Sequence, residues 1–144
     1  MLNLTSHLAL PGFVLSIIVL ALRGNLISSM PVVALGQLFG LALMIWARAI
    51  FPKGSFRVTA KPAGSTVLRK GPYRLIRHPM YAGAMLILWT SIAGHASTVN
   101  AAIGLSASAL VLGKILFEEQ LLKVSLPGYP EYARATKALI PYIF

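Results

Sequence analysis

The side chains of this sequence that could do chemistry are concentrated in two short segments about forty residues apart. The first is RHPMYAG, residues 77–83, at the start of an apolar run. The second is the glutamate pair 118–119, which closes another apolar run and has Lys114 shortly before it. Basic groups, an imidazole and two carboxylates can bind both ends of a zwitterion and can exchange protons. That chemistry requires elements that bring the two segments together.

The first segment predicts the start of a helix. Proline is favoured at the first helical position, and the residue before a proline adopts extended geometry. We therefore expect Pro79 to begin the helix, with His78 as its cap or beside it. The backbone amides and positive dipole end of such a start bind anions. The alternative is that Arg77 and His78 meet lipid headgroups and Tyr81 belongs to an interfacial aromatic belt.

The second segment is notable because no acidic residue precedes it in the chain. Ionisable groups near an apolar helix are unfavourable and are candidates for function. Lys114 and Glu118 are one helical turn apart and share a face. A glutamate suits an ammonium, so the two segments together would bind an amino-acid moiety, with Tyr73 and Tyr81 covering a cation or a flat ring. The alternative is a surface pair just past the end of the helix, either solvated or paired with arginines of the loop.

The composition is that of a membrane protein. The sequence is 57% hydrophobic and 11% charged, whereas soluble domains carry about 25% charged residues. It contains no cysteine, which excludes thiol catalysis, disulfides and thiolate metal ligands, and we expect no metal site. Nucleic-acid binding would need a soluble basic face with base-stacking groups, so we expect the lipid bilayer as a partner and no nucleic acid.

Four apolar segments predict about four transmembrane helices, at residues 2–22, 31–50, 79–94 and 98–117. A span needs roughly 20 residues and must satisfy its own backbone hydrogen bonds. No basic residue precedes the first segment, so we expect a retained span and not a signal peptide. The short link between the third and fourth predicts an antiparallel hairpin. Because their lengths are similar, the glutamates should return to the depth at which the third helix begins.

The charges predict the orientation of these spans. Eight of the thirteen basic residues lie between positions 48 and 77, and Lys123, Arg134 and Lys137 follow in the tail. By the positive-inside rule, that loop and both termini face the cytoplasm. The loop is also long and rich in proline and glycine, which is typical of functional loops.

These motifs resemble the isoprenylcysteine carboxyl methyltransferase family and the related membrane phospholipid methyltransferases. The resemblance rests on the GPY at 71–73, RHPMYAG, a helical hairpin, the glutamate pair and a tyrosine-containing tail, and it covers about residues 61–141. Members are integral membrane enzymes that use S-adenosylmethionine. The resemblance therefore implies a single all-α integral membrane methyltransferase domain over residues 1–144, similar to small members of the bacterial inner membrane.

The resemblance also implies a cosubstrate site and a set of catalytic candidates. The catalytic candidates are His78, Lys114 and Glu118. Lys114 stands where eukaryotic members tend to have an arginine that contacts substrate, and lysine lacks the planar fork of arginine. The cosubstrate would be bound by Ser65, Thr66, Val67, Leu68, Tyr73, His78, Pro79, Met80, Tyr81, Glu118 and Glu119.

Methyl transfer from a sulfonium needs alignment and exclusion of water, and no cysteine or metal. We expect a lipophilic acceptor, either the carboxylate of a prenylcysteine-like compound or a phospholipid amine. The amine must first lose a proton, which His78 or a glutamate would accept. Two other classes remain open: a non-catalytic membrane scaffold of the same fold, and a small transporter that binds a cation at Glu118, although such sites usually lie at the membrane midplane.

Overall fold

The structure, a computed structural model, describes residues 2–50 and 67–143, with side chains from residue 8 onward. Every regular element in these ranges is helical, as the sequence predicts, and a parallel bridge joins Ile76 to Lys137. The elements are α1 (Leu2–Leu22), α2 (Pro31–Ile50), the 3₁₀ helix η1 (Gly71–Arg74), α3 (Pro79–Gly94), α4 (Thr98–Ser125) and α5 (Tyr129–Ala135).

The bounds of α1, α2 and α3 are those of the first three predicted apolar segments. Of the described helices, α2 and α4 are long and apolar enough to cross a membrane. The parts Leu8–Leu22 of α1 and Pro79–Gly94 of α3 are shorter apolar stretches. Two candidate spans are therefore present in the described ranges, and the four-span arrangement stays a prediction.

α4 extends further than its apolar run predicts. The sequence places its end at residue 117, but the helix continues to Ser125. The extension is built from good helix formers, mainly Glu, Gln, Leu and Lys, so loss of apolar character does not end it. Leu126 then turns extended, with φ −119° and ψ 109°, because it precedes Pro127. The glutamate pair therefore lies inside α4, not just past its end.

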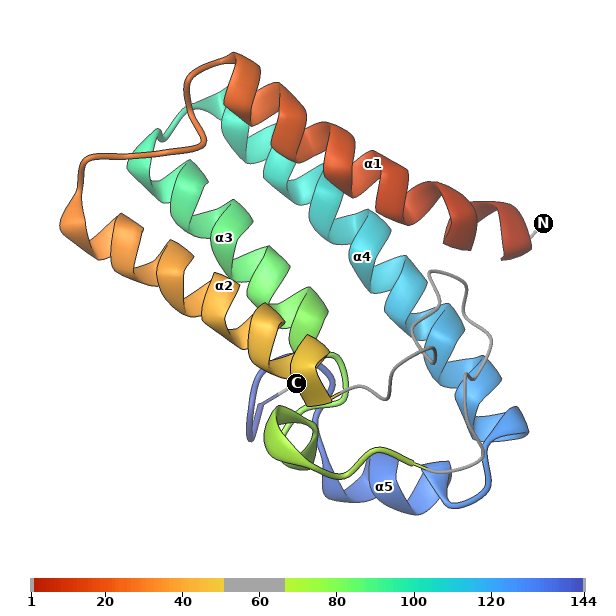
Figure 1. The fold of residues 1–144 in the computed structure, drawn as a ribbon. Helices are drawn as coiled ribbons and strands as arrows, with labels where there is room; N and C mark the ends of the chain where they lie inside the picture. The colour runs from red at the N-terminus through yellow and green to blue at the C-terminus, as the bar shows by residue number, and fades with distance from the viewer. Residues whose placement is uncertain (1, 51–66, 144) are drawn as a thin grey trace.

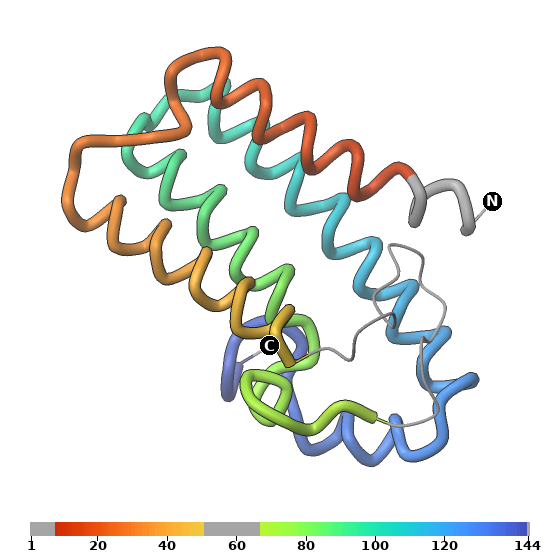
Figure 2. Tube along the Cα trace, viewed as in Figure 1, coloured from red at the N-terminus to blue at the C-terminus, as the bar shows by residue number. Residues whose placement is uncertain are grey.

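The four long helices pack as two antiparallel pairs, α1 with α4 and α2 with α3 (Figures 1 and 2). α3 and α4 follow each other through the short link 95–97 but contact each other less than each contacts its own partner. The α2–α3 pair is close because glycines face each other. A Cβ built on Gly83 would lie 2.5 Å from the Gly40 carbonyl oxygen. Small residues that let backbones approach are the usual basis of helix association in lipid.

The core lies between α1, α3 and α4, and a buried polar cluster closes the end of the molecule that holds the α3–α4 link. The core includes Leu20, Leu88, Ala107 and Ile115. At the link, the fully buried Asn100 donates through Nδ2 to the His95 carbonyl at 2.6 Å. Buried amide groups require such partners, so this cluster fixes how α4 begins.

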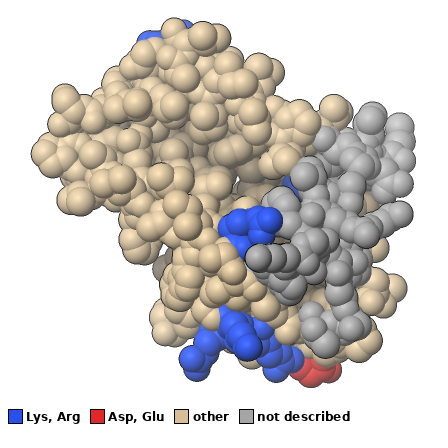
Figure 3. All heavy atoms as spheres, viewed as in Figure 1, with Lys and Arg blue, Asp and Glu red and all other residues tan. Residues whose placement is uncertain are grey.

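The opposite end of the molecule is basic. The exposed side chains there come from the segment after residue 67, from η1 and from the region of α5, and Figure 3 shows blue Lys and Arg atoms gathered over it. They include Arg69, Lys70, Arg74, Arg134 and Lys137. Large apolar side chains such as Leu35, Leu38 and Phe39 are instead exposed on α2, an apolar surface of the kind that suits lipid.

Candidate active site

The start of α3 is held in place by the C-terminal tail. The His78 backbone N–H donates to the Ala138 carbonyl at 3.0 Å, and that of Arg77 donates to the Lys137 carbonyl at 2.8 Å. The Lys137 N–H returns a bond to the Leu75 carbonyl at 3.2 Å. The pairing continues the parallel bridge between Ile76 and Lys137. His78 itself, with φ −122° and ψ 58°, does not have the extended geometry that the sequence predicts for a residue before proline. The tail thereby fixes the backbone from which the histidine side chain projects.

Glu119 is the centre of the polar cluster at this end of α4. Its Oε1 atom accepts from Arg77 Nε at 2.6 Å, from Tyr129 Oη at 2.9 Å and from His78 Nε2 at 2.9 Å. The Arg77 guanidinium also donates to the carbonyls of Ala133 and Thr136. Glu119 and Arg77 therefore join α4, the start of α3 and the end of α5 in one buried network.

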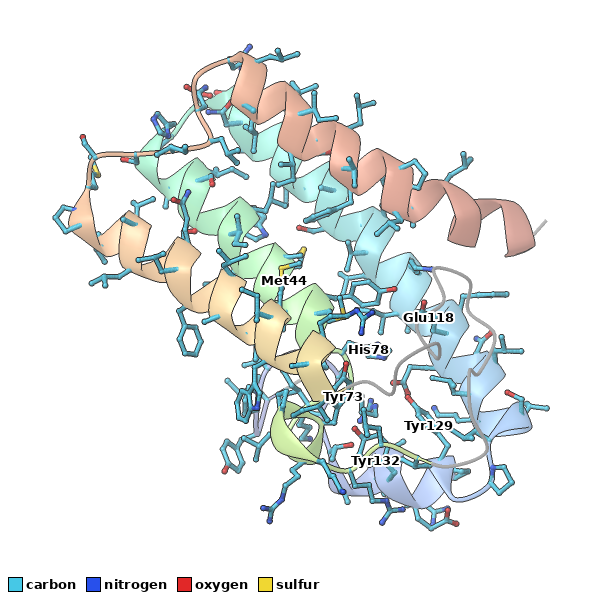
Figure 4. All side chains as sticks on the ribbon, viewed as in Figure 1. Met44, Tyr73, His78, Glu118, Tyr129 and Tyr132 are labelled. Carbon is cyan, nitrogen blue, oxygen red and sulfur yellow. The ribbon has the colours of Figure 1, made fainter. Side chains whose placement is uncertain are left out.

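Glu118 faces a different set of partners. Its Oε1 atom accepts from Tyr81 Oη at 2.9 Å and from Lys114 Nζ at 3.0 Å. Its Oε2 atom lies 3.8 Å from His78 Nδ1, which is longer than a hydrogen bond. The His78 ring stacks on the Tyr81 ring with centroids 5.7 Å apart. His78 thus lies between the two glutamates, with one ring nitrogen toward each. Figure 4 labels His78 and Glu118 at this end of the molecule.

Tyrosines of α5 and η1 line the basic end of this cluster. Tyr132 Oη donates to the Tyr73 carbonyl at 2.6 Å, and Arg69 lies 5.8 Å from the Tyr132 ring centroid. Burial raises the pKa of Tyr73 and of Tyr132 to about 12. Burial and the adjacent Glu119 charge also raise the pKa of Tyr129. These phenols therefore stay protonated at neutral pH, and Tyr129 and Tyr132 act as hydrogen-bond donors.

The structure brings only part of the predicted site together. His78, Pro79, Tyr81, Glu118 and Glu119 gather with Lys114 at the start of α3 and in α4. This is the proximity that the similar lengths of the two apolar segments predict. What these side chains bind stays a prediction.

Other members of the predicted set lie elsewhere. Ser65 and Thr66 fall outside the described residues. Leu68 is half-buried, and Val67 packs against Leu126, Tyr129 and Tyr132. Tyr73 is buried in η1 beside α5. Met80 lines an open apolar groove of about 430 Å³ with residues of α2, which include Met44 and Arg48.

Arg77 and Tyr129 belong to the cluster, although the sequence analysis does not place them in the site. Arg77 stands in the quoted motif, and Tyr129 stands in the tail after a Pro-Gly turn. A partial signal was available in both cases: an ionisable side chain beside an apolar helix needs a partner, and a large aromatic side chain is often buried. Neither signal reveals that one carboxylate oxygen binds both side chains.

The cluster is balanced in charge, and its histidine and glutamates are not arranged as a metal site. Arg77 and Lys114 supply two positive charges, and Glu118 and Glu119 supply two negative charges. Across residues 2–50 and 67–143, no three His, Cys, Asp or Glu side chains are arranged to hold a metal ion. A charge-balanced site with an imidazole suits a zwitterionic ligand better than a simple ion.

One comparison with known proteins covers both residues 77–83 and the glutamate pair 118–119. A family model described as the isoprenylcysteine carboxyl methyltransferase (ICMT) family matches residues 15–124. The chain is also similar to the cobalt-zinc-cadmium resistance protein CzcN of Cupriavidus metallidurans, at 33% identity over 78 residues. That match covers 54% of this chain and 36% of CzcN, so the chain spans about a third of that relative. No solved structure matches the chain.

Proposed function

The chain belongs to the isoprenylcysteine carboxyl methyltransferase family, and from that membership we propose that it is an integral membrane enzyme that transfers a methyl group from S-adenosylmethionine to a lipophilic acceptor. One observation carries the proposal. The matched region contains a charge-balanced cluster in which Glu118, His78 and Tyr81 meet at the start of α3. Such a cluster suits the amino-acid end of the methyl donor.

The chemistry of the cluster agrees with the parts of S-adenosylmethionine. A carboxylate at Glu118 would bind its ammonium group, and the amide end of α3 would bind its carboxylate. When bound, the donor supplies an activated methyl group on its sulfonium. The remaining residues that the family resemblance implies would complete the site, namely Ser65, Thr66, Val67, Leu68, Tyr73, Pro79 and Met80.

The acceptor is proposed to be lipophilic because the helices carry apolar grooves on their outer surface, one of which begins at Met80, beside the start of α3. Met80 lines one of them with α2. A second groove, of about 400 Å³, runs between α1 and α2 and is lined mainly by aliphatic side chains such as Ile17 and Leu38. An acyl or prenyl chain suits such surfaces. A prenylcysteine-like compound carries a prenyl chain, and a phospholipid carries acyl chains.

The polar groups of the cluster would position the acceptor. Lys114 lies one turn deeper in α4 than Glu118, where its ammonium would orient an anionic head group. A carboxylate acceptor is nucleophilic at neutral pH, so it would need only this alignment. An amine acceptor would have to release a proton, which a glutamate or His78 would accept.

The membrane arrangement is part of the proposal. We propose four spans, with α3 and α4 as a hairpin and both termini on the cytoplasmic side of a bacterial inner membrane. The gathering of exposed Lys and Arg at the η1 and α5 end supports this orientation. The methyl donor would then reach the cluster from the cytoplasm, and the acceptor would reach it from the bilayer.

Two alternatives make different predictions. A non-catalytic scaffold of the same fold would not bind the methyl donor. A cation transporter would use Glu118 as its binding carboxylate, but Lys114 already lies 3.0 Å from that side chain and would compete with the cation. Donor binding therefore separates the proposal from both.

Calorimetric titration of the detergent-solubilised protein with S-adenosylmethionine is the first test. We expect saturable binding, and we expect transfer of labelled methyl to prenylcysteine analogues or phosphatidylethanolamine in preference to water-soluble carboxylates. Absence of donor binding by the folded protein would overturn the proposal. Preferential methylation of the soluble carboxylates would overturn the lipophilic acceptor alone.

A further inference from the structure

The two adjacent glutamates of α4 have different roles. We propose that Glu119 is a positioning residue that holds His78 in the tautomer with a proton on Nε2. In consequence, His78 Nδ1 and Glu118 Oε2 form a paired acceptor site for a primary ammonium group. That the ammonium belongs to the methyl donor rests on the function proposed above, whereas the role of Glu119 does not.

The Oε1 atom of Glu119 is already occupied by groups of the protein itself. It accepts three hydrogen bonds, from Arg77 Nε, His78 Nε2 and Tyr129 Oη, at 2.6, 2.9 and 2.9 Å. The Glu119 side chain is only 9% exposed. A carboxylate oxygen has about two lone-pair sites, so three donors fill this one. Its contacts serve the packing of α3, α4 and α5 against one another.

These contacts determine the position of the histidine proton. A carboxylate paired with a guanidinium at 2.6 Å is ionised and can only accept hydrogen bonds. The contact of 2.9 Å between Glu119 Oε1 and His78 Nε2 therefore requires the proton on Nε2. In a neutral imidazole the other ring nitrogen then carries a lone pair. His78 Nδ1 is consequently an acceptor.

That acceptor faces a second acceptor. His78 Nδ1 and Glu118 Oε2 lie 3.8 Å apart, with no proton available from either atom to join them. A donor with several N–H bonds that approached both atoms would satisfy the two at once, and an ammonium carries three. The Lys114 Nζ atom lies 3.0 Å from the other carboxylate oxygen of Glu118, Oε1. The Tyr81 ring, stacked on His78, adds an aromatic surface that attracts cations.

Four variants separate the two roles. In Glu119→Gln the amide oxygen must face Arg77 and Tyr129, which both donate, so it still accepts from His78 Nε2. In Glu119→Ala that acceptor is gone. Glu118→Gln leaves the tautomer but weakens the proposed ammonium site. Tyr129→Phe is the matched control, because it removes one donor from the same Glu119 oxygen and leaves the histidine contact in place.

Nitrogen-15 NMR of histidine-labelled protein without ligand tests the tautomer. The chain has three histidines, so single replacements of His7 and His95 by Gln assign the signals. At about pH 8.5, where an ordinary imidazole is neutral, we expect His78 to carry its proton on Nε2 in the parent, in Glu119→Gln and in Tyr129→Phe. Glu119→Ala should show a tautomer mixture. An Nδ1 proton or an imidazolium in the parent, or an unchanged tautomer in Glu119→Ala, would overturn the role of Glu119.

Affinity for S-adenosylmethionine tests the ammonium site. Glu118→Gln should weaken binding roughly ten- to two-hundredfold, the scale of one charge-assisted hydrogen bond. Glu119→Gln should weaken it by less than about fivefold, because the Gln oxygen still accepts from His78 Nε2 and Glu118 keeps its charge. An equal loss in the two Gln variants would overturn the division of roles. If the parent binds no donor, the proposed function and the ammonium site fail together, and the NMR result still decides the role of Glu119. Should Glu119→Ala fail to fold, an Nδ1 proton or an imidazolium in the parent protein would still overturn the role of Glu119, and the two Gln variants still test the division of roles.

Discussion

A lysine buried beside a glutamate is the least expected pairing of single residues in this molecule. Lys114 is only 4% exposed, and its Nζ lies 3.0 Å from Glu118 Oε1. Removing two charges from water is unfavourable, and their attraction offsets this only in good geometry. The Tyr81 hydroxyl supplies a further bond to the same carboxylate at 2.9 Å. The pair is therefore better explained by the chemistry of the site than by stability.

The free energy of unfolding should depend on the pair and not on each member separately. Lys114→Met leaves the Glu118 carboxylate without its buried partner and should destabilise the protein by about 3 to 5 kcal/mol. Adding Glu118→Gln should recover a large part of that loss, because no uncompensated charge remains. A double-mutant cycle of chemical denaturation in detergent measures this coupling. Strictly additive losses would show that the two side chains do not interact.

At the scale of elements, the glycine of the RHPMYAG segment has a packing role. Gly83 meets Gly40 where α3 crosses α2, and a Cβ on Gly40 would lie 2.7 Å from the Gly83 carbonyl oxygen. The atom in the way is backbone, so it cannot move aside without shifting a helix. The motif thus contributes both a histidine to the site and a contact that fixes the helix carrying it.

Alanine substitutions should distinguish this crossing from other helical glycines. Gly83→Ala and Gly40→Ala should each destabilise the protein by about 1 to 3 kcal/mol, the usual effect of overpacking. Gly113→Ala in α4 is the matched control, since its Cβ would meet nothing within 4 Å. It should be neutral or stabilising by up to about 1 kcal/mol, the helix-propensity gain of alanine. Thermal unfolding in detergent compares the stability of the three variants. Equal changes in all three would contradict the close approach of Gly83 and Gly40.

α5 is held by phenols that donate hydrogen bonds only while protonated. Tyr129 bonds to Glu119, and Tyr132 bonds to the Tyr73 carbonyl. The pKa of Tyr73 and of Tyr132 is raised to about 12 from an ordinary value near 10. The native state therefore holds these protons where the unfolded chain has released them.

The docking of α5 should weaken at alkaline pH. Between about pH 10 and 12 the unfolded chain binds fewer protons than the native one, so stability falls as the pH rises. The contribution is complete below pH 10 and is lost as the pH passes about 12. We expect Tyr132→Phe to flatten this fall, measured as the unfolding midpoint from pH 8 upward. A slope identical to that of the parent protein would contradict the role of Tyr132.

At the scale of the whole molecule, the two helix pairs have chemically different ends. One end holds the buried Asn100 cluster and the α3–α4 link. The other holds the candidate active site and exposed basic residues that include Arg69, Arg74 and Lys137. Basic residues at one end attract anionic headgroups and set orientation during insertion.

Site-directed labelling should find these two ends on opposite sides of the membrane. The chain contains no cysteine, so Ala96→Cys and Ala135→Cys each introduce a single thiol at an exposed position. We expect a membrane-impermeant reagent to label Ala135→Cys from the cytoplasmic side and Ala96→Cys from the other side. If both thiols were labelled from the same side, α4 would not cross the membrane between them and the proposed orientation would be wrong.

The positions of the long helices follow from local sequence. Continuous apolar runs, proline at the first turn of α2 and of α3, and the absence of strand patterns set the bounds of α1, α2 and α3. The approach of the glutamates to His78 also follows from the similar lengths of two consecutive apolar segments. These features depend either on a few neighbouring residues or on the number of residues in consecutive apolar segments.

Only the tertiary structure decides which donors each carboxylate receives. Glu118 and Glu119 differ by about 100° around α4, and that rotation sends one toward Tyr81 and Lys114 and the other toward Arg77 and Tyr129. The tail pairing, the continuation of α4 and the choice of helix partners also depend on contacts between distant residues. Hydrogen bonds of this kind form wherever packing places donors near acceptors, and a linear pattern does not record that placement.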